Sequence, residues 1–98
     1  MSEFSEMIAG TKPVLVDFYA TWCGPCKMQS PVLDEVKRRM GDDIVVVKVD
    51  VDHNREVAAA YHVQSIPTLM VFRGGEMLWR GTGLRQADDL VERLRQYL

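Results

Sequence analysis

Short runs of β-branched and apolar residues alternate with segments of helical periodicity along most of this chain. The first run follows Pro13 and reads Val-Leu-Val-Asp-Phe-Tyr over residues 14–19, and the second spans Ile44 to Val49. Runs of this kind are typical of buried strands. Strands that alternate with helices pair in parallel through right-handed crossovers. The alternation therefore predicts an α/β fold.

Helices are expected before, between and after these strands. The first ends near Gly10, and the longest follows the cysteine turn, reaches about Met40 and is expected to kink at Pro31. Asn54 is expected to cap a short third helix. The expected apolar faces consist of Phe4, Met7 and Ile8; Met28, Val32, Leu33, Val36 and Met40; Val57, Ala58 and Tyr61; and Leu90, Val91, Leu94 and Leu98.

Two further strands, Thr68 to Phe72 and Met77 to Arg80, flank Gly74-Gly75, which is a strong signal for an antiparallel hairpin. The expected architecture is a central mixed four-stranded sheet with helices on both faces. At 98 residues, we expect one domain over residues 1–98. Active loops of such sheets gather beyond the carboxyl ends of the parallel strands, where Cys23 is expected.

Charge and hydropathy exclude several classes of partner. The net charge is −2 with no run of like sign, so nucleic acid is not expected as a partner. No stretch approaches the roughly 20 apolar residues that span a bilayer. Residues 1–11 carry Glu3 and Glu6 and lack the apolar run of a secretory signal, so we expect a cytoplasmic protein.

The two cysteines, Cys23 and Cys26, carry the chemistry that the sequence predicts. Cys23 lies where the first strand gives way to a helix, so free backbone N–H groups and the helix dipole favour its thiolate. The intervening Gly24 and Pro25 let the two sulfurs reach bonding distance, and Pro25 stiffens the turn. We expect a redox-active disulfide that needs no further cofactor.

A role is predicted for each of these groups. Cys23 is expected at the exposed edge of the turn, as the nucleophile that attacks a substrate disulfide, and Cys26 behind it, as the resolving thiol. Asp17 lies in the middle of an apolar strand, where burial raises the pKa of a carboxyl toward neutrality. Asp17 is therefore the expected proton acceptor for Cys26, and the alternative is a merely satisfied buried carboxylate.

Inert core cysteines and half of a zinc site are the alternatives for the pair. Only His53 and His62 offer further nitrogen ligands, and eight residues separate them instead of the three to five of a zinc finger. We therefore expect no metal and interpret both histidines as surface or helix-end residues.

Residues 16–28, Val-Asp-Phe-Tyr-Ala-Thr-Trp-Cys-Gly-Pro-Cys-Lys-Met, resemble the active-site segment of thioredoxins, and the similarity extends from Pro13 to the C-terminus. Further matches are Pro31, Lys48-Val49-Asp50, Ser65-Ile66-Pro67-Thr68 and Gly83. The resemblance implies a thioredoxin-like fold, a protein-disulfide reductase, disulfide-containing protein substrates and a thioredoxin reductase as partner. A disulfide isomerase and a redox-linked binding subunit are the alternatives, and the redox potential of the cysteine couple discriminates between reductase and isomerase.

The resemblance also implies roles outside the cysteine turn. Pro67 is expected in the cis form opposite the sulfurs, and the backbone of Ile66 is expected to pair with an extended substrate segment. Lys48 is expected near Asp17, where it tunes the charge of that carboxyl. The implied docking surface consists of Trp22, Gly24, Pro25, Ile66, Pro67 and Gly83.

The chain departs from the thioredoxin pattern in three places. The 12 residues ahead of Pro13 cannot hold both a helix and the further strand usual in the family, so Ile44 to Val49 is expected to form an edge strand. Pairing with a second chain is possible at such an edge, but flanking charges protect edges, and we expect a monomer. His62 replaces a glycine that is left-handed in the family, and Gln86 replaces a serine cap. The protecting charges are Asp42, Asp43, Lys48, Asp50 and Asp52.

Overall fold

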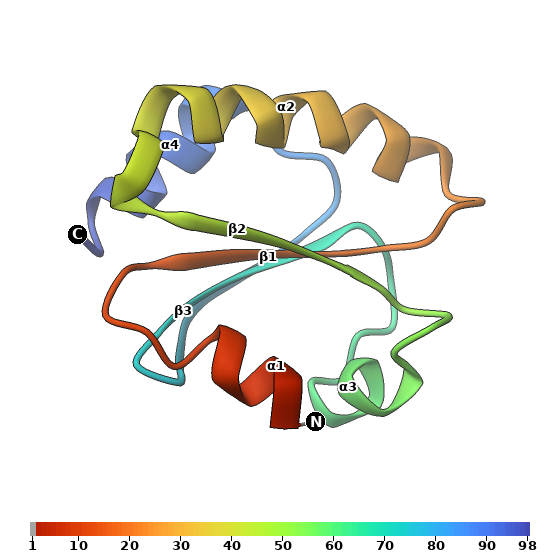
Figure 1. Ribbon diagram of the computed structural model, residues 1–98. Helices are drawn as coiled ribbons and strands as arrows, with labels where there is room; N and C mark the ends of the chain where they lie inside the picture. Colours follow the sequence, from red (N-terminus) through yellow and green to blue (C-terminus); the bar gives the residue numbers. More distant parts are fainter. Residues whose placement is uncertain (1) are drawn as a thin grey trace.

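The computed structural model describes residues 2–98, and its centre is a four-stranded sheet (Figure 1). The strands are β1 (Val14–Tyr19), β2 (Val45–Asp50), β3 (Thr68–Arg73) and β4 (Glu76–Thr82), in the spatial order β2-β1-β3-β4. β1 and β2 pair in parallel, whereas β3 is antiparallel to both of its neighbours. The expected mixed sheet and hairpin are confirmed.

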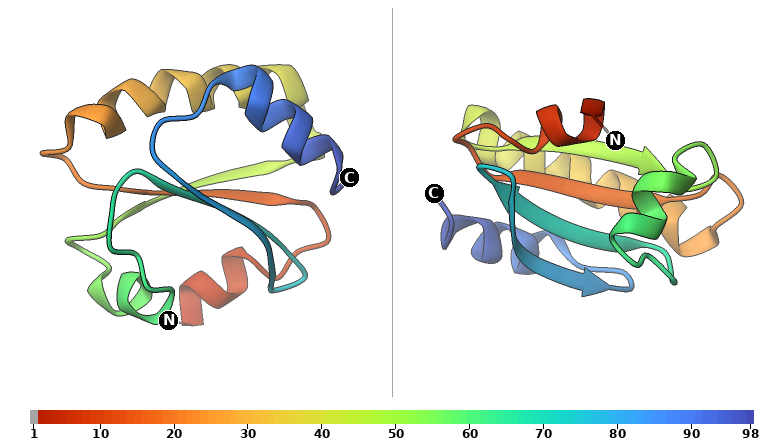
Figure 2. Two further views of the ribbon diagram at one scale, coloured as in Figure 1. Left: turned by 180° about the vertical axis from the view of Figure 1, so that it is seen from behind. Right: turned by 90° about the horizontal axis from the view of Figure 1, so that it is seen from below.

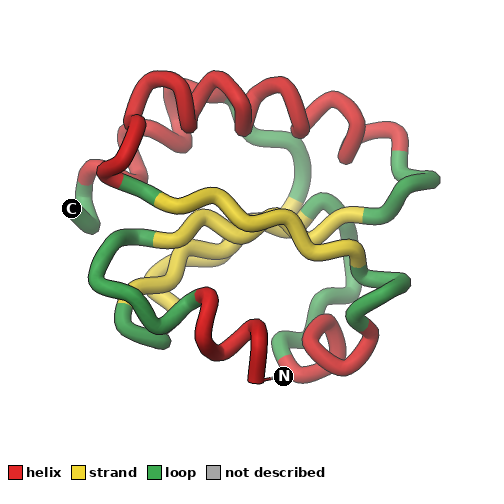
Figure 3. The backbone as a smooth tube through the Cα atoms, in the orientation of Figure 1, coloured by secondary structure: helices red, strands yellow, loops and turns green. Residues whose placement is uncertain are grey.

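Helices cover both faces of the sheet, as Figures 2 and 3 show. One face carries α2 (Gly24–Met40) and α4 (Ala87–Arg95), and the other carries α1 (Ser2–Met7) and α3 (Arg55–Ala60). A short 3₁₀ turn, Gly41–Asp43, links α2 to β2. No helix among residues 2–98 is long and apolar enough to cross a membrane.

The alternation of side chains along β1 divides the core into two layers. Leu15 packs under α2 and α4, whereas Val14, Val16 and Phe18 pack under α1 and α3. All four of these side chains are almost completely buried, so β1 is the central, doubly covered strand that the apolar run predicted. Asp17 is the one charged residue within this strand.

Several details differ from the expectation. Met28 is 61% exposed, because the buried face of α2 runs through Cys26, Gln29 and Leu33, and Met28 lies about 100° around the helix from Gln29. Met7 is exposed at the end of α1, and Leu98 is exposed beyond the end of α4.

The expected capping of the helices needs one correction. Asn54 precedes α3 as expected, but it does not cap the helix, because its side-chain amide donates to the carbonyl of Asp50. α2 continues through Pro31 to Met40 without interruption, and a kink at Pro31 stays a prediction. Gln86 precedes α4 and makes no side-chain capping bond.

Two of the departures from the thioredoxin pattern are confirmed by the fold. No strand precedes β1 in the described residues, and β2 pairs only with β1, so β2 is an edge strand. His62 has a φ of 55°, in the left-handed region. The Arg80 guanidinium of β4 donates to the carbonyls of both Tyr61 and His62, which holds the end of α3 in this conformation.

Candidate active site

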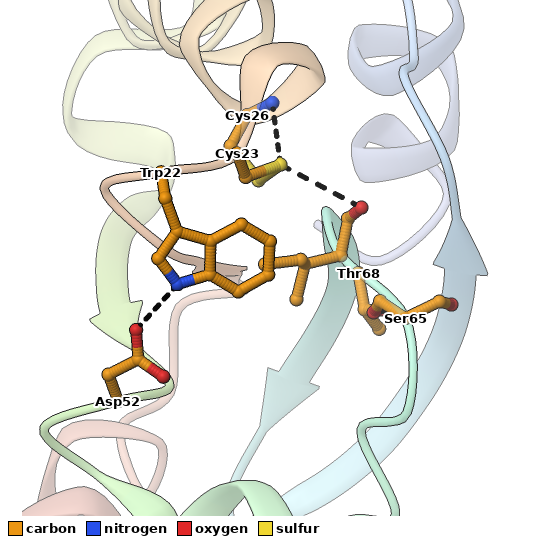
Figure 4. Close-up of a disulfide and its surroundings, with 7 residues drawn as sticks. Trp22, Cys23, Cys26, Asp52, Ser65 and Thr68 are labelled. Atoms are coloured by element: carbon orange, nitrogen blue, oxygen red, sulfur yellow. Dashed lines mark hydrogen bonds between the residues drawn. A yellow bond between two sulfur atoms is a disulfide. The ribbon is translucent and has the colours of Figure 1, made fainter.

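The two cysteines lie at the junction of β1 and α2 and are joined by a disulfide (Figure 4). Cys23 is the N-cap residue of α2, and its Sγ accepts a hydrogen bond from the backbone N–H of Cys26 at 3.2 Å. Gly24 and Pro25 occupy the first two helical positions, where Pro25 costs no hydrogen-bond donor. The turn therefore brings the two Cα atoms to 5.3 Å without a break in the helix.

The expected difference in exposure between the two cysteines is wrong. Cys23 is 5% exposed and Cys26 is 4% exposed, because Cys23 Sγ turns inward and lies 3.9 Å from the carbonyl oxygen of Ile66. The two sulfurs differ instead in their neighbours. Cys23 faces Ile66, whereas Cys26 lines a cavity on the side of Asp17.

Asp17 is 2% exposed, and its side chain borders the same cavity as Cys26. The pKa of the Asp17 carboxyl is raised from 3.8 to about 6. Burial is the larger cause and raises the pKa, whereas the positive charge of Lys48 lowers it by a smaller amount. Asp17 Oδ1 has no hydrogen-bond partner among the described residues. A carboxyl in this state can accept a proton near neutral pH.

Lys48 lies opposite Asp17 in the parallel register of β1 and β2, as the resemblance implied. Its ammonium group does not form an ion pair with Asp17 among the described residues. It donates instead to Ser30 Oγ at 2.6 Å. Both Lys48 and Ser30 line the cavity of about 380 Å³ that Asp17 and Cys26 share. Sequence analysis missed Ser30, although its place four residues after Cys26 puts it on the same side of α2.

Trp22 is 69% exposed beside the cysteine turn, and its indole N–H donates to Asp52 Oδ2 at 2.8 Å (Figure 4). Asp52 follows the carboxyl end of β2, where active loops were expected to gather, but sequence analysis gave it no role at the site. This bond fixes the direction of the exposed ring.

The remaining predicted residues meet on the other side of Cys23. The Ile66–Pro67 peptide bond is cis, as expected. The carbonyl oxygen of Pro67 accepts a hydrogen bond from Gly83 N at 2.9 Å, and Gly83 has a φ of 83°, which favours glycine. Pro67 is buried, Ile66 is half-buried, and Gly24, Pro25 and Gly83 are exposed.

This arrangement is that of a thiol–disulfide exchange site. It combines a disulfide at a helix N-terminus with a buried carboxyl whose pKa is raised toward neutrality. The family model for thioredoxin matches residues 1–96. Thioredoxin of Bacillus subtilis is 48% identical over 87% of this chain and 82% of its own length. A thioredoxin-like protein of Synechocystis is 46% identical over 99% of this chain and 93% of its own.

Solved structures agree with the sequence relatives. A mutant thioredoxin from Halobacterium salinarum superposes with a TM-score of 0.91 at 38% identity, over 99% of this chain and 84% of that one. The chain therefore belongs to the thioredoxin family. It is a thiol–disulfide oxidoreductase that acts as a protein-disulfide reductase.

Proposed function

We propose that Cys23 is the nucleophile and Cys26 the resolving thiol of this reductase. The observation that carries the assignment is the hydrogen bond from Cys26 N–H to Cys23 Sγ at the start of α2. A backbone donor and the positive end of the helix dipole both stabilise a thiolate on Cys23. Cys26 instead lines the cavity that Asp17 also lines. This position supports the role of Cys26 as the thiol that must lose a proton.

The proposed cycle begins with the reduced pair. The Cys23 thiolate attacks one sulfur of a substrate disulfide, and the second substrate sulfur leaves as a thiolate that takes a proton from solvent. Asp17 accepts the proton of Cys26, whose thiolate then attacks Cys23 Sγ and releases the first substrate sulfur. Two electrons pass from the pair to the substrate, and the pair ends as the Cys23–Cys26 disulfide.

Protein substrates would dock on the surface around Cys23. Trp22, Gly24, Pro25 and Gly83 are exposed there, which supports this assignment. The backbone of Ile66 would pair with an extended substrate segment next to Cys23 Sγ. Pro67, which is buried, would support the backbone of Ile66 in this pairing. Lys48 would act through the charge of Asp17 and would not contact the substrate.

Turnover requires a source of electrons, and we propose a thioredoxin reductase as the partner that recharges the disulfide. A relative from Mycobacterium leprae is called bifunctional thioredoxin reductase/thioredoxin, and it is 45% identical over 95% of this chain, which spans 22% of its length. No cofactor beyond the cysteine pair is needed for the exchange itself. Because this cycle runs in a reducing compartment, we place the protein in the cytoplasm.

Trapping of the mixed disulfide tests the two cysteine assignments. Cys26→Ser should accumulate protein substrates bound through Cys23, because the resolving attack is lost. Cys23→Ser should accumulate none. Non-reducing electrophoresis of each variant after incubation with a disulfide-containing protein measures the trapped fraction. Equal trapping by both variants, or reductase activity retained in Cys23→Ser, would show the assignment to be wrong.

A further inference from the structure

A fully buried glutamine lies one turn beyond Cys26 on the inner face of α2. Gln29 has no exposed surface, and it stands in a row of apolar side chains that continues through Leu33 and Val36. A buried amide is costly unless its donor and its acceptor are both paired. The partners of Gln29 therefore indicate what this residue does.

Both polar atoms of the Gln29 side chain bind the backbone of one residue. Nε2 donates to the carbonyl of Arg85 at 3.0 Å, and Oε1 accepts from the N–H of Arg85 at 2.8 Å. Arg85 lies in the loop of residues 83–86, which connects β4 to α4 and passes beneath α2 (Figure 2). The two bonds thus join the active-site helix to a loop that is 56 residues away in sequence.

The other contacts of this loop involve its two ends and the side chain of Arg85. Gln86 makes no capping bond to α4, and both Gly83 and Leu84 are exposed. The Arg85 side chain lies 5.5 Å over the Trp79 ring and donates to Thr82 O at 3.3 Å. Two further backbone hydrogen bonds anchor the ends of the loop: Gly83 N donates to the carbonyl of Pro67, and the carbonyl of Gln86 accepts from Leu90 N in α4.

We propose that Gln29 is a positioning residue for the docking of protein substrates. Its paired bonds fix the backbone of Arg85 and, through the chain, hold Gly83 against Pro67 beside Cys23. The exposed Gly83-Leu84 pair then forms a preformed wall of the docking surface. This proposal rests on the proposed docking function of Gly83. It predicts that Gln29 affects large substrates and leaves the cysteine chemistry alone.

The substitution Gln29→Met separates these effects, since methionine keeps the length of the side chain and loses both hydrogen bonds. We expect KM for a protein disulfide such as insulin to rise about fivefold, the size of one lost net hydrogen bond. The second-order rate with a small aromatic disulfide should stay within about twofold, because a small disulfide needs only Cys23. Gln96→Met, a change of an exposed glutamine after α4, is the matched control and should leave both values unchanged.

Amide hydrogen exchange of Arg85 provides a second measurement that does not depend on activity. Its exchange should accelerate in Gln29→Met and stay slow in the parent and in Gln96→Met. Gln29→Glu is a second variant, to be used if the methionine variant does not fold. It keeps the oxygen that accepts from Arg85 N–H and loses the donor. We expect of it, too, a higher KM for the protein disulfide and an unchanged rate with the small disulfide.

Three results would overturn the proposal. One is unchanged exchange at Arg85. Another is faster exchange with an unchanged KM for the protein disulfide, which would show that the loop is not a docking wall. The third is an equal loss with both substrates, which would assign Gln29 to the cysteine chemistry. A parent protein inactive on both substrates would instead refute the proposed function, and the role of Gln29 with it.

Discussion

At the scale of single residues, Asp17 carries a carboxyl that is costly to ionise because it is buried. Its carboxyl is buried at the cavity that residues of α2 also line, and one of its oxygens has no hydrogen-bond partner among the described residues. The charged and titratable groups around its cavity are Tyr19 of β1, Cys26 and Lys27 of α2, and Lys48 of β2. Of these, Lys48 is the one whose charge lowers the pKa of Asp17.

Asp17→Asn should make the protein more stable at pH 7 while slowing its turnover. The folded-state pKa of Asp17, about 6, lies above the ordinary value of 3.8 that the unfolded chain has, so ionisation costs the folded state more than the unfolded one. The penalty is absent below pH 3.8, grows between pH 3.8 and 6, and reaches up to about 3 kcal/mol above that range. Urea unfolding of parent and variant from pH 3 to 8 measures it.

The matched control for this prediction is Asp34→Asn, a change of an exposed carboxylate on α2. That variant should show no gain in stability that grows with pH. If Asp17→Asn were less stable than the parent at pH 7, the cost that we assign to the buried charge would be wrong.

Lys48→Met should raise the pKa of the Asp17 carboxyl further, because the ammonium charge that favours the ionised form is removed. Carbon-detected NMR titration of the Asp17 side chain measures this pKa directly. Lys27→Met is the matched control, since Lys27 lines the same cavity without contributing to the shift. An equal rise in both variants would mean that Lys48 has no specific effect on Asp17.

At the scale of elements, the end of α3 is held in an unfavourable conformation by contacts from β4. His62 has a positive φ, and Arg80 donates to its carbonyl at 2.7 Å. Left-handed conformation costs a residue with a Cβ about 1–2 kcal/mol, and glycine avoids this cost. The contact with β4 therefore stabilises a turn that the local sequence disfavours.

His62→Gly should stabilise the protein by about 0.5–1 kcal/mol, which is the relieved strain less the entropy that glycine loses on folding. The midpoint of urea unfolding should rise with an unchanged slope. His62→Ala is the control, because alanine keeps the Cβ and should bring no comparable gain. Equal gains in both variants would attribute the effect to the loss of the imidazole and not to φ.

At the scale of the whole molecule, the unpaired edge of β2 is the place where a second chain could add a strand. Val45 is 39% exposed on this edge, and its exposed neighbours include Lys48 and Asp43. Val46 packs against the core, so Val45 is the better position at which to test the edge. Charges beside a short strand oppose pairing with another chain.

The protein should therefore be monomeric at high concentration. Multi-angle light scattering over a wide concentration range measures its mass, and Val45→Lys is the matched variant in which edge pairing is blocked. The parent and the variant should have the same mass throughout. A dimer that forms in the parent with rising concentration and disappears in Val45→Lys would establish β2 as an interface instead.

The sequence by itself determined the elements and the central chemistry, because these depend on residues close together along the chain. Alternation and periodicity located β1, β2, the hairpin and the helices to within a few residues. The spacing of Cys23 and Cys26 after a strand predicted a pair at a helix N-terminus. The isolated charge of Asp17 in an apolar strand predicted its raised pKa.

The resemblance to thioredoxins implied that Lys48, Pro67 and Gly83 lie at this site, and only the tertiary structure decided the particular contacts among distant groups there. The inward turn of Cys23 Sγ toward Ile66, the bond of Trp22 to Asp52 and the paired bonds of Gln29 to Arg85 each join residues 30 or more positions apart. Lys48 was expected near Asp17, but its bond to Ser30 depends on how α2 lies across the sheet. Such contacts are set by the packing of α2 and the loops on the strands, and no periodicity along the chain encodes them.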